Sequence, residues 1–223
     1  MKNRTLYLIV ICLLAILAIV GCSHATDENL PMETDSYSST DHDRIYTEAC
    51  ELIWPYMQLE GVRALSPDSK QSREELNRGI SLLRTVVEIK PTNSSAYWVM
   101  GKAYQALDQS EDACDAFGEA FAIGKDNPDI AREYMLECLN LGRASDAIDA
   151  AEHGVSLKPD DAGLVANLAI AYLVGGRVND ALTTVNRSLT LSPDDKVTLH
   201  VKKLILEVRD GKRPQPNSAQ DLG

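Results

Sequence analysis

Apolar residues in this chain recur at helical spacing, not at the alternation of a strand. One segment carries four of them at i, i+4, i+7 and i+8, on a single helical face: Ala113, Phe117, Ala120 and Phe121. Gly142 and Gly176 follow such runs, and glycine is common just after a helix ends. The segments "LKPDD" and "LSPDD" stop one helix and offer an Asp to cap the next. The pattern predicts short helices over about residues 43–209, with no sheet.

Small residues occupy many of the inward positions and would let neighbouring helices cross closely. They are Gly101, Ala113, Ala120, Ala147, Gly154, Ala169 and Ala181. A hairpin of two such helices has an apolar face that it cannot bury alone. We therefore expect the hairpins to stack on one another.

Proline turns recur with a fixed period. Pro159 and Pro193 are 34 residues apart, and Pro91 precedes Pro159 by twice that interval. At the missing position, "GKDNP" moves the proline to Pro128. This register predicts three repeats, at residues 94–127, 128–161 and 162–195.

The repeat resembles the tetratricopeptide repeat, whose period is also about 34 residues. The first copy supplies family-type residues at Gly101, Tyr104, Ala113, Phe117 and Ala120, and the third at Leu168, Ala169, Tyr172, Gly176, Ala181 and Pro193. The second keeps Gly142, Ala147, Gly154 and Pro159, but has Met135 and Cys138 where Gly and Tyr are usual. The resemblance implies an all-α solenoid of antiparallel helix pairs in a right-handed superhelix.

The segments flanking the three repeats are less regular. Residues 43–93 are interpreted as a divergent first helical unit, broken near Pro55. Residues 196–210 have the apolar spacing of a capping helix that covers the last repeat. Residues 211–223 are polar and contain proline, so we predict a disordered tail.

The N-terminus reads as an export signal. Lys2 and Arg4 precede an apolar run over residues 6–20, too short to span a bilayer as a helix. The sequence "IVGC" ending at Cys22 resembles a bacterial lipobox. The resemblance implies that residues 1–21 are a signal peptide, and that Cys22 carries a diacylglycerol and acyl chains such as palmitate. An ordinary secretory signal or short anchor with a chance cysteine is the alternative.

Residues 22–42 are polar and are interpreted as a flexible tether. Ser23, rather than Asp, follows the cysteine. In bacteria with two membranes this resembles the default for the outer membrane. The expected location is therefore an exported protein, anchored by lipid and facing the periplasm.

The charge balance argues against nucleic acid as a partner. The net charge is -11, and loss of Lys2 and Arg4 with the signal would make it -13. A small basic set near the end is interpreted as a solvated helix end: Lys202, Lys203, Arg209, Lys212 and Arg213.

No catalytic motif was found in the sequence. Histidines are scattered, and the patterns HExxH, GxSxG, GxGxxG and CxxC are absent. We therefore predict no catalytic residue, metal or cofactor; a helical envelope hydrolase would need a clustered nucleophile or metal set. Cys114 and Cys138 fall on adjacent helices of the repeat frame. Two buried thiols or a disulfide in an oxidising compartment both remain open.

In the tetratricopeptide family, the first helix of each repeat lines a concave groove. The implied partner-binding residues are Trp98, Lys102, Gln105, Arg132, Leu136, Asn140, Asn167 and Ile170, with Glu133, Leu173 and Val174 beside them. Trp98, Lys102 and Arg132 would form a centre suited to an acidic and apolar partner segment. Trp98 has a core role as its alternative, Leu136 a packing role, and Ile170 could pack on the capping helix.

These features predict a lipid-anchored scaffold or adaptor that binds a protein or peptide. An assembly factor for a pilus, a secretion system or outer-membrane proteins is an alternative within the same class. Self-association into a homo-oligomer through exposed repeat edges is a structural alternative.

Overall fold

The computed structural model describes residues 39–59 and 64–222. The predicted signal peptide, Cys22 and most of the predicted tether lie outside these residues. The end of that tether does not: helix α2 (Ser39–Ile53) begins at Ser39, within the segment predicted to be flexible. Among the described residues no helix is long and apolar enough to cross a membrane.

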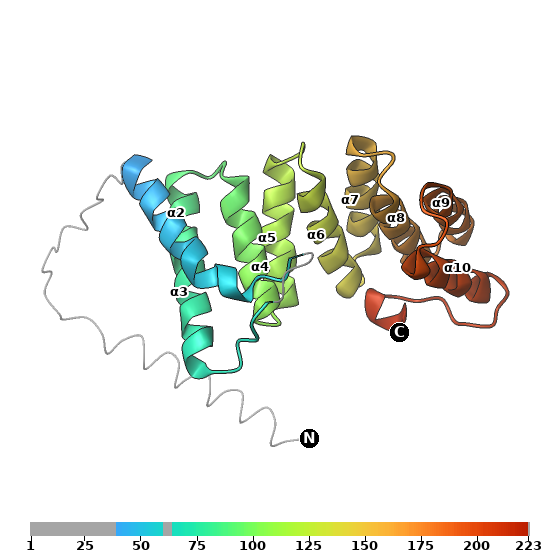
Figure 1. Cartoon of the computed structure of the whole chain (residues 1–223), viewed down its shortest axis with the longest axis horizontal. Helices are drawn as coiled ribbons and strands as arrows, with labels where there is room; N and C mark the ends of the chain where they lie inside the picture. The colour runs from blue at the N-terminus through green and yellow to red at the C-terminus, as the bar shows by residue number, and fades with distance from the viewer. Residues whose placement is uncertain (1–38, 60–63, 223) are drawn as a thin grey trace, which may run out of the picture. The chain divides into compact units, whose positions relative to one another are not determined.

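The described chain is built from α-helices that pack on their neighbours in sequence. They are α2, α3 (Lys70–Ile89), α4 (Ser94–Ala106), α5 (Ser110–Ile123), α6 (Pro128–Asn140), α7 (Ala144–Leu157), α8 (Ala162–Val174), α9 (Val178–Leu191) and α10 (Lys196–Arg209). Figure 1 shows them side by side in chain order, from α2 at one end to α9 and α10 at the other. Residues 39–59 and 64–222 form no β-strand. The prediction of an all-α solenoid of stacked helix pairs is confirmed.

A polar cap begins each first helix, and the caps recur every 34 residues. The side chains of Asn93, Asn127, Asp161 and Asp195 accept hydrogen bonds from the first-turn N–H groups of α4, α6, α8 and α10, at 2.7–3.0 Å. Each cap satisfies a donor that has no partner within its own helix. The turn residues repeat too. Gly142 and Gly176 have φ near +70°, and Asp108, at the corresponding position of the preceding repeat, has φ 60°.

Small residues allow the close packing that the sequence suggested. Ala113, Ala120, Ala147 and Ala181 are fully buried. A Cβ added to Gly101 would lie 2.6 Å from the Phe117 ring, so only glycine fits at this crossing. The buried side chains form three consecutive apolar clusters along the stack.

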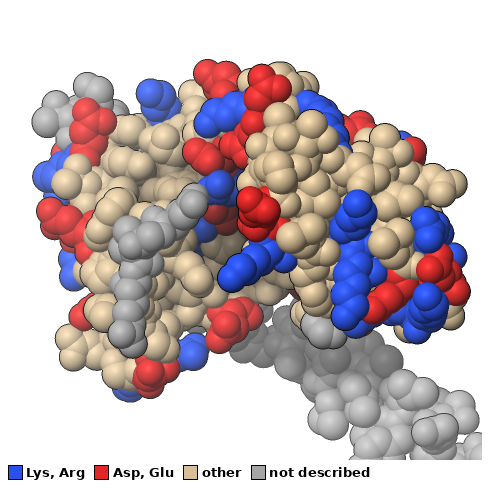
Figure 2. Space-filling view, turned by 45° about the vertical axis from the view of Figure 1, so that its right-hand side comes forward, with Lys and Arg blue, Asp and Glu red and all other residues tan. Residues whose placement is uncertain are grey.

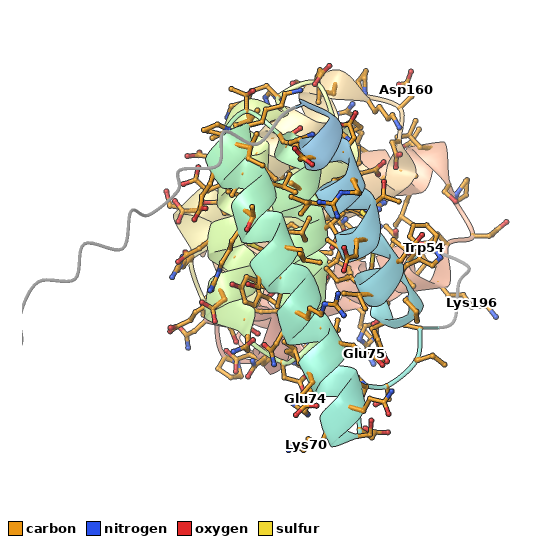
Figure 3. The ribbon with its side chains drawn as sticks, turned by 90° about the vertical axis from the view of Figure 1, so that its left-hand side faces the viewer. Trp54, Lys70, Glu74, Glu75, Asp160 and Lys196 are labelled. Atoms are coloured by element: carbon orange, nitrogen blue, oxygen red, sulfur yellow. The ribbon has the colours of Figure 1, made fainter. Side chains whose placement is uncertain are left out.

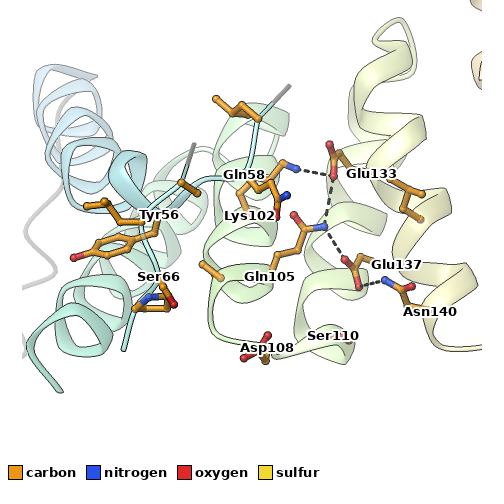
Figure 4. A pocket seen from close by; sticks show the side chains of 16 residues that line it. Tyr56, Gln58, Ser66, Lys102, Gln105, Asp108, Ser110, Glu133, Glu137 and Asn140 are labelled. Carbon is orange, nitrogen blue, oxygen red and sulfur yellow. Dashed lines mark hydrogen bonds and ion pairs between the residues drawn. The ribbon is translucent and has the colours of Figure 1, made fainter. Parts of the chain in front are cut away.

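The first helical unit pairs α2 with α3. A 3-10 turn, η1 (Trp54–Tyr56), follows α2 at Pro55. Helix α3 then begins after Ser69, whose hydroxyl accepts from the N–H of Ser72 in a capping box. The described residues between η1 and α3 have no helical structure and lie beside α4 and α6 (Figure 4).

The prediction of a disordered tail is wrong for residues 211–222. Two backbone N–H groups, of Asn217 and Ser218, donate to the Asp221 carboxylate at 2.8 and 3.2 Å. The Gln215 side chain donates to the backbone carbonyl of Leu173. A short 3-10 helix, η2 (Ala219–Leu222), contacts α6, and Leu222 packs on two of the apolar clusters. The composition is polar, but these few apolar and hydrogen-bonding groups find partners on the solenoid.

Candidate functional site

A cleft lies where the described residues of the segment after Pro55, 56–59 and 64–67, face helices α4 and α6. Its volume is about 760 Å³. The lining residues are Tyr56, Gln58, Leu59, Ala64, Leu65, Ser66 and Pro67 from that segment, then Lys102, Gln105, Ala106, Asp108, Ser110, Glu133, Leu136, Glu137 and Asn140. Figure 2 shows a hollow on this face, with basic and acidic side chains beside it. A cleft of this size holds several side chains of an extended segment.

An ion pair forms the inner part of the floor. The Lys102 ammonium lies 2.7 Å from Glu133, and the two side chains are only 4% and 10% exposed. The ammonium also lies 5.7 Å from the centre of the Trp98 ring and 5.9 Å from that of Phe117. A buried charge is tolerated because its partner and these ring faces replace water. Lys102 therefore joins α4 to α6 and has little charge left to offer a partner.

A second carboxylate in the floor is held by amides. The Gln105 side-chain amide donates to Glu137 at 2.6 Å and reaches Glu133 at 3.5 Å, and Asn140 reaches Glu137 at 3.5 Å (Figure 4). Glu137 is buried, and no Lys, Arg or His nitrogen of the described chain lies within 4.0 Å of it. These amides orient the carboxylate but leave its negative charge uncompensated.

Asp108 adds a further negative charge at the cleft wall. It occupies the left-handed position that Gly142 and Gly176 hold in the next two repeats. A non-glycine residue pays a conformational cost there, although Asp tolerates it better than most. With Asp108, three lining carboxylates face one ammonium, so the cleft has an excess of two negative charges.

The rim of the cleft is apolar and aromatic. Leu65 is 60% exposed and Leu136 37% exposed, on opposite walls. The Tyr56 hydroxyl donates to Glu75 of α3 at 2.8 Å. This hydrogen bond raises the pKa of Tyr56 and lowers the pKa of Glu75. It ties the cleft wall to the first helical unit.

The predicted groove residues divide into two groups. Lys102, Gln105, Leu136 and Asn140 meet in the cleft. The other four do not line it: Trp98, Arg132, Asn167 and Ile170.

The predicted centre at Trp98, Lys102 and Arg132 does not present two free cations. Lys102 is buried and paired, and Arg132 pairs with Asp129 one turn away at 3.3 Å. Trp98 packs against the first apolar cluster, and its indole N–H is buried with no hydrogen-bond partner in the described chain. The periodic frame placed these residues on the correct helices, but it carried no information on which charges would be neutralised.

Several lining residues were missed by sequence reasoning. Asp108 had a signal, because it lies 34 residues before Gly142 in the repeat register. Glu137 follows the groove residue Leu136 directly, and helical geometry alone did not single it out. Tyr56 and Leu65 belong to an irregular segment, and nothing in their spacing predicts that they lie beside α4 and α6.

The groove beyond the cleft is occupied by the chain itself. Ile170 and the tail residues Ala219 and Leu222 pack against the second apolar cluster, and Asn167 of α8 is half-buried. The backbone carbonyl of Asn217 lies 3.0 Å from where a Cβ on Gly142 would stand. The C-terminal half of the predicted groove is therefore covered by residues 215–222.

Metal chemistry has no candidate residues in the described ranges. No group of three or more His, Cys, Asp or Glu side chains there is arranged to hold a metal ion. What the cleft offers is recognition: oriented carboxylates, amides and an apolar rim.

Comparison with known families places part of the chain among tetratricopeptide repeats. Residues 95–161 match the family described as "YpiA-like, C-terminal tetratricopeptide repeats". A comparison with curated protein sequences finds no match.

Solved structures share the fold at low sequence identity. MamA residues 41–end from Desulfovibrio magneticus RS-1 superposes with a TM-score of 0.59 at 16% identity, over 77% of this chain and 86% of that one. YrrB, described as a TPR protein with an unusual peptide-binding site, gives 0.55 at 17% identity, over 68% and 76%. Pseudomonas aeruginosa pilF gives 0.54 at 16% identity, over 76% and 71%. These likenesses show that the chain has the tetratricopeptide-repeat fold.

Proposed function

We propose that this chain is a non-catalytic scaffold that receives a segment of a partner protein in the cleft that residues 56–59 and 64–67 form with helices α4 and α6. The observation that carries the proposal is Glu137, a buried carboxylate that amides orient and no cation neutralises. Proteins rarely keep such a charge in a recess without a compensating group. The peptide-binding site named for YrrB, which shares this fold, is consistent with the proposal.

The chemistry of the cleft favours a basic and apolar partner segment, the reverse of the acidic partner expected from sequence. A Lys or Arg side chain of the partner would compensate Glu137 and Asp108, and an apolar side chain would cover Leu65 and Leu136. The net charge of -11 would also speed the approach of a basic segment.

Export and lipid anchoring at Cys22 are part of the same proposal. The basic start, the short apolar run and "IVGC" support it. Two or more acyl chains would hold the scaffold at a membrane, on the outer membrane facing the periplasm in a bacterium that has one. Assembly of an envelope machine is the more specialised form of this role.

Site-specific photocrosslinking in native cells tests the cleft. A photoreactive residue at Leu136 should capture a partner. The matched control is Leu191 of α9, whose exposure of 39% is close to the 37% of Leu136 but which lies outside the cleft. Glu137→Gln should weaken that capture by about tenfold or more, since loss of a buried charge partner costs at least ~1.4 kcal/mol. Equal capture from both leucines, or no effect of Glu137→Gln, would refute this use of the cleft.

Mass spectrometry of the native protein tests the anchor. The mature chain should begin at Cys22 and carry acyl mass on it, and Cys22→Ser should release the protein from membranes or leave the precursor uncut. A mature chain that retains residues before Cys22 contradicts lipidation without touching the cleft.

Self-association remains a second candidate because Val197 and Leu199 of α10 are exposed apolar residues at the end of the solenoid, as is Trp54 near the other end (Figure 3). Sedimentation at micromolar concentration should then show a dimer or larger assembly. Val197→Asp with Leu199→Asp should return it to a monomer.

A further inference from the structure

Two thiols from adjacent repeats meet in the core, away from the cleft. Cys114 lies on α5 and Cys138 on α6, and their sulfur atoms are 3.6 Å apart. Both residues are fully buried. A disulfide has a sulfur–sulfur distance of about 2.05 Å, so the two atoms need to approach by about 1.5 Å.

The pair is chemically asymmetric. The Arg143 guanidinium lies 3.4 Å from the Cys114 sulfur and 3.5 Å from the Asp115 carboxylate. The hydrogen bond from Cys138, and then Arg143, lower the pKa of Cys114. The same hydrogen bond and burial raise the pKa of Cys138. Cys114 is therefore the more readily ionised thiol of the pair, and we assign it as the nucleophile.

A second cleft lies next to Cys114, whose side chain is itself fully buried. Cys114 lines this cleft of about 470 Å³, together with Tyr97, Tyr104, Asp115, Glu119 and Tyr134 among others. This cleft is separate from the one that holds Glu137. Cys114 lines this cleft and Cys138 does not, so a small disulfide held there would meet Cys114 first once a local opening exposes its sulfur.

We propose that Cys114 and Cys138 are a redox pair that closes to a disulfide between adjacent repeats. The oxidant is a disulfide of the glutathione class. The Cys114 thiolate attacks one of its sulfurs, forming a mixed disulfide and expelling one thiolate, which takes a proton from solvent. Cys138 then loses its proton to solvent and attacks the Cys114 sulfur, expelling the second thiolate, which also takes a proton from solvent. Two cysteine thiols are oxidised and one disulfide is reduced to two thiols, so atoms and electrons balance.

The disulfide would fix α6, the helix that carries Glu137, against α5. The inference is independent of partner binding and of export, because it rests only on the two sulfurs and their surroundings.

Peptide mapping of the full chain after incubation in an oxidised glutathione buffer tests the pair. Free thiols are alkylated in denaturant before digestion. We expect a Cys114–Cys138 linked peptide that dithiothreitol separates, with Cys50, which is half-buried, serving as the internal control. Cys50→Ser should leave the link unchanged. Alkylation of both Cys114 and Cys138, or a stable glutathione adduct on Cys114 in the unaltered chain, overturns the proposal.

Two variants test the order of attack. Cys138→Ser should trap the glutathione adduct on Cys114, because the resolving thiol is gone. Arg143→Gln, at an exposed position, should slow adduct formation several-fold near neutral pH and lose that effect at alkaline pH, where Cys114 ionises without help. If Arg143→Gln and the unaltered chain form the adduct at the same rate at neutral pH, Arg143 does not activate Cys114. That result would overturn the assignment of Cys114 as the activated thiol.

Thermal unfolding supplies a readout that needs no variant. The disulfide would close a loop between two cysteines that are 24 positions apart in sequence. Closing such a loop should raise Tm by roughly 6–12 °C in the oxidised chain relative to the reduced chain. An oxidised chain whose melting temperature equals that of the reduced chain would contradict a cross-link between the repeats.

Discussion

The two halves of the solenoid groove have the same repeat framework but different contents. Between α4 and α6 the groove is an open cleft with a charged floor and an apolar rim. Around α8 it is covered by the chain's own residues 215–222, with Leu222 on the apolar clusters. The repeats themselves do not create this difference. It arises from segments outside them: residues 56–59 and 64–67 lie beside the groove at one end, and the tail fills it at the other.

The comparison teaches that a groove residue's role depends on its neighbours as much as on its repeat position. Lys102 and Ile170 both lie on first helices of their repeats. Lys102 is paired with Glu133 and buried, whereas Ile170 packs on two apolar clusters together with Leu222. Neither offers its side chain freely to a partner.

Breaking the buried ion pair should have the largest effect and should strike the N-terminal half. Lys102→Ala leaves Glu133 buried without its cation, so we expect the free energy of unfolding to fall by about 3–5 kcal/mol. Denaturant unfolding followed by circular dichroism measures this. Arg132→Ala is the control, because its exposed pair with Asp129 should contribute no more than ~0.5 kcal/mol.

A double change sharpens that test. Lys102→Met with Glu133→Leu removes both charges and should recover much of the lost stability. If Lys102→Ala lowers the free energy of unfolding no more than Arg132→Ala does, the ammonium is not buried in solution. Lys102 would then be available to contact a partner, as the sequence predicts.

Detaching the tail should open the C-terminal half at a smaller cost. Leu222→Asp puts a charge against the apolar clusters, and we expect a loss of about 1–3 kcal/mol with faster amide exchange in α8. Gln220→Asp adds the same charge at an exposed position two residues earlier and should change stability by less than ~0.5 kcal/mol. If the two variants have equal stability and equal amide exchange in α8, the tail does not pack on the clusters and is disordered, as its composition predicts.

Exchanging the turn residues of the two halves should produce small, opposite effects. Asp108→Gly relieves a left-handed backbone at φ 60° and should stabilise the chain by about 0.5 kcal/mol. Gly176→Asp, with φ +73° and no heavy atom within 4 Å of its added Cβ, should destabilise it by about 0.5–1 kcal/mol. Asp108→Gly should also weaken capture of a basic partner. A stabilised variant with undiminished capture would exclude Asp108 from recognition.

The smallest expected effect concerns the hydrogen bond that ties the cleft wall to α3. The pKa of Glu75 is lowered by the Tyr56 hydroxyl, so the stability that this bond contributes is present above the ordinary Glu pKa of 4.5 and is lost as pH falls through the lowered value. The pKa of Tyr56 is raised, so the contribution is also lost as pH rises through that raised value, above 10.0.

Melting temperatures of the unaltered chain and of Tyr56→Phe, measured across pH, check this dependence. The difference between the two should be constant near neutrality and shrink at both extremes. A difference that persists unchanged into acid would mean that the Tyr56 hydroxyl has a partner other than the Glu75 carboxylate.

Local patterns account for the part of the fold that sequence reasoning predicted. Helix type, helix turns and the positions of small residues follow from contacts within about one repeat, which is why the 34-residue period revealed them. Each helix cap accepts a hydrogen bond from a residue two or three positions later, so the caps can be predicted from sequence without tertiary structure. They are Asn93, Asn127, Asp161 and Asp195.

The 34-residue period alone was not enough to predict the site. Four predicted residues do meet in the cleft, because a repeat register assigns each residue to a helix face. Whether Lys102 presents or neutralises its charge depends on Glu133, 31 residues later on another helix. The cleft wall and the tail belong to irregular segments outside the repeats, so the repeat register does not predict where they lie.

By itself, the sequence determined that this protein is a stack of helical hairpins with small residues at the crossings, because those features depend on spacing and short-range hydrogen bonds. Only the tertiary structure decided which half of the groove is open, which charges remain uncompensated there, and that Cys114 and Cys138 touch. Those outcomes depend on pairwise distances between segments far apart in the chain, and desolvation then sets the chemistry of each group that is brought together.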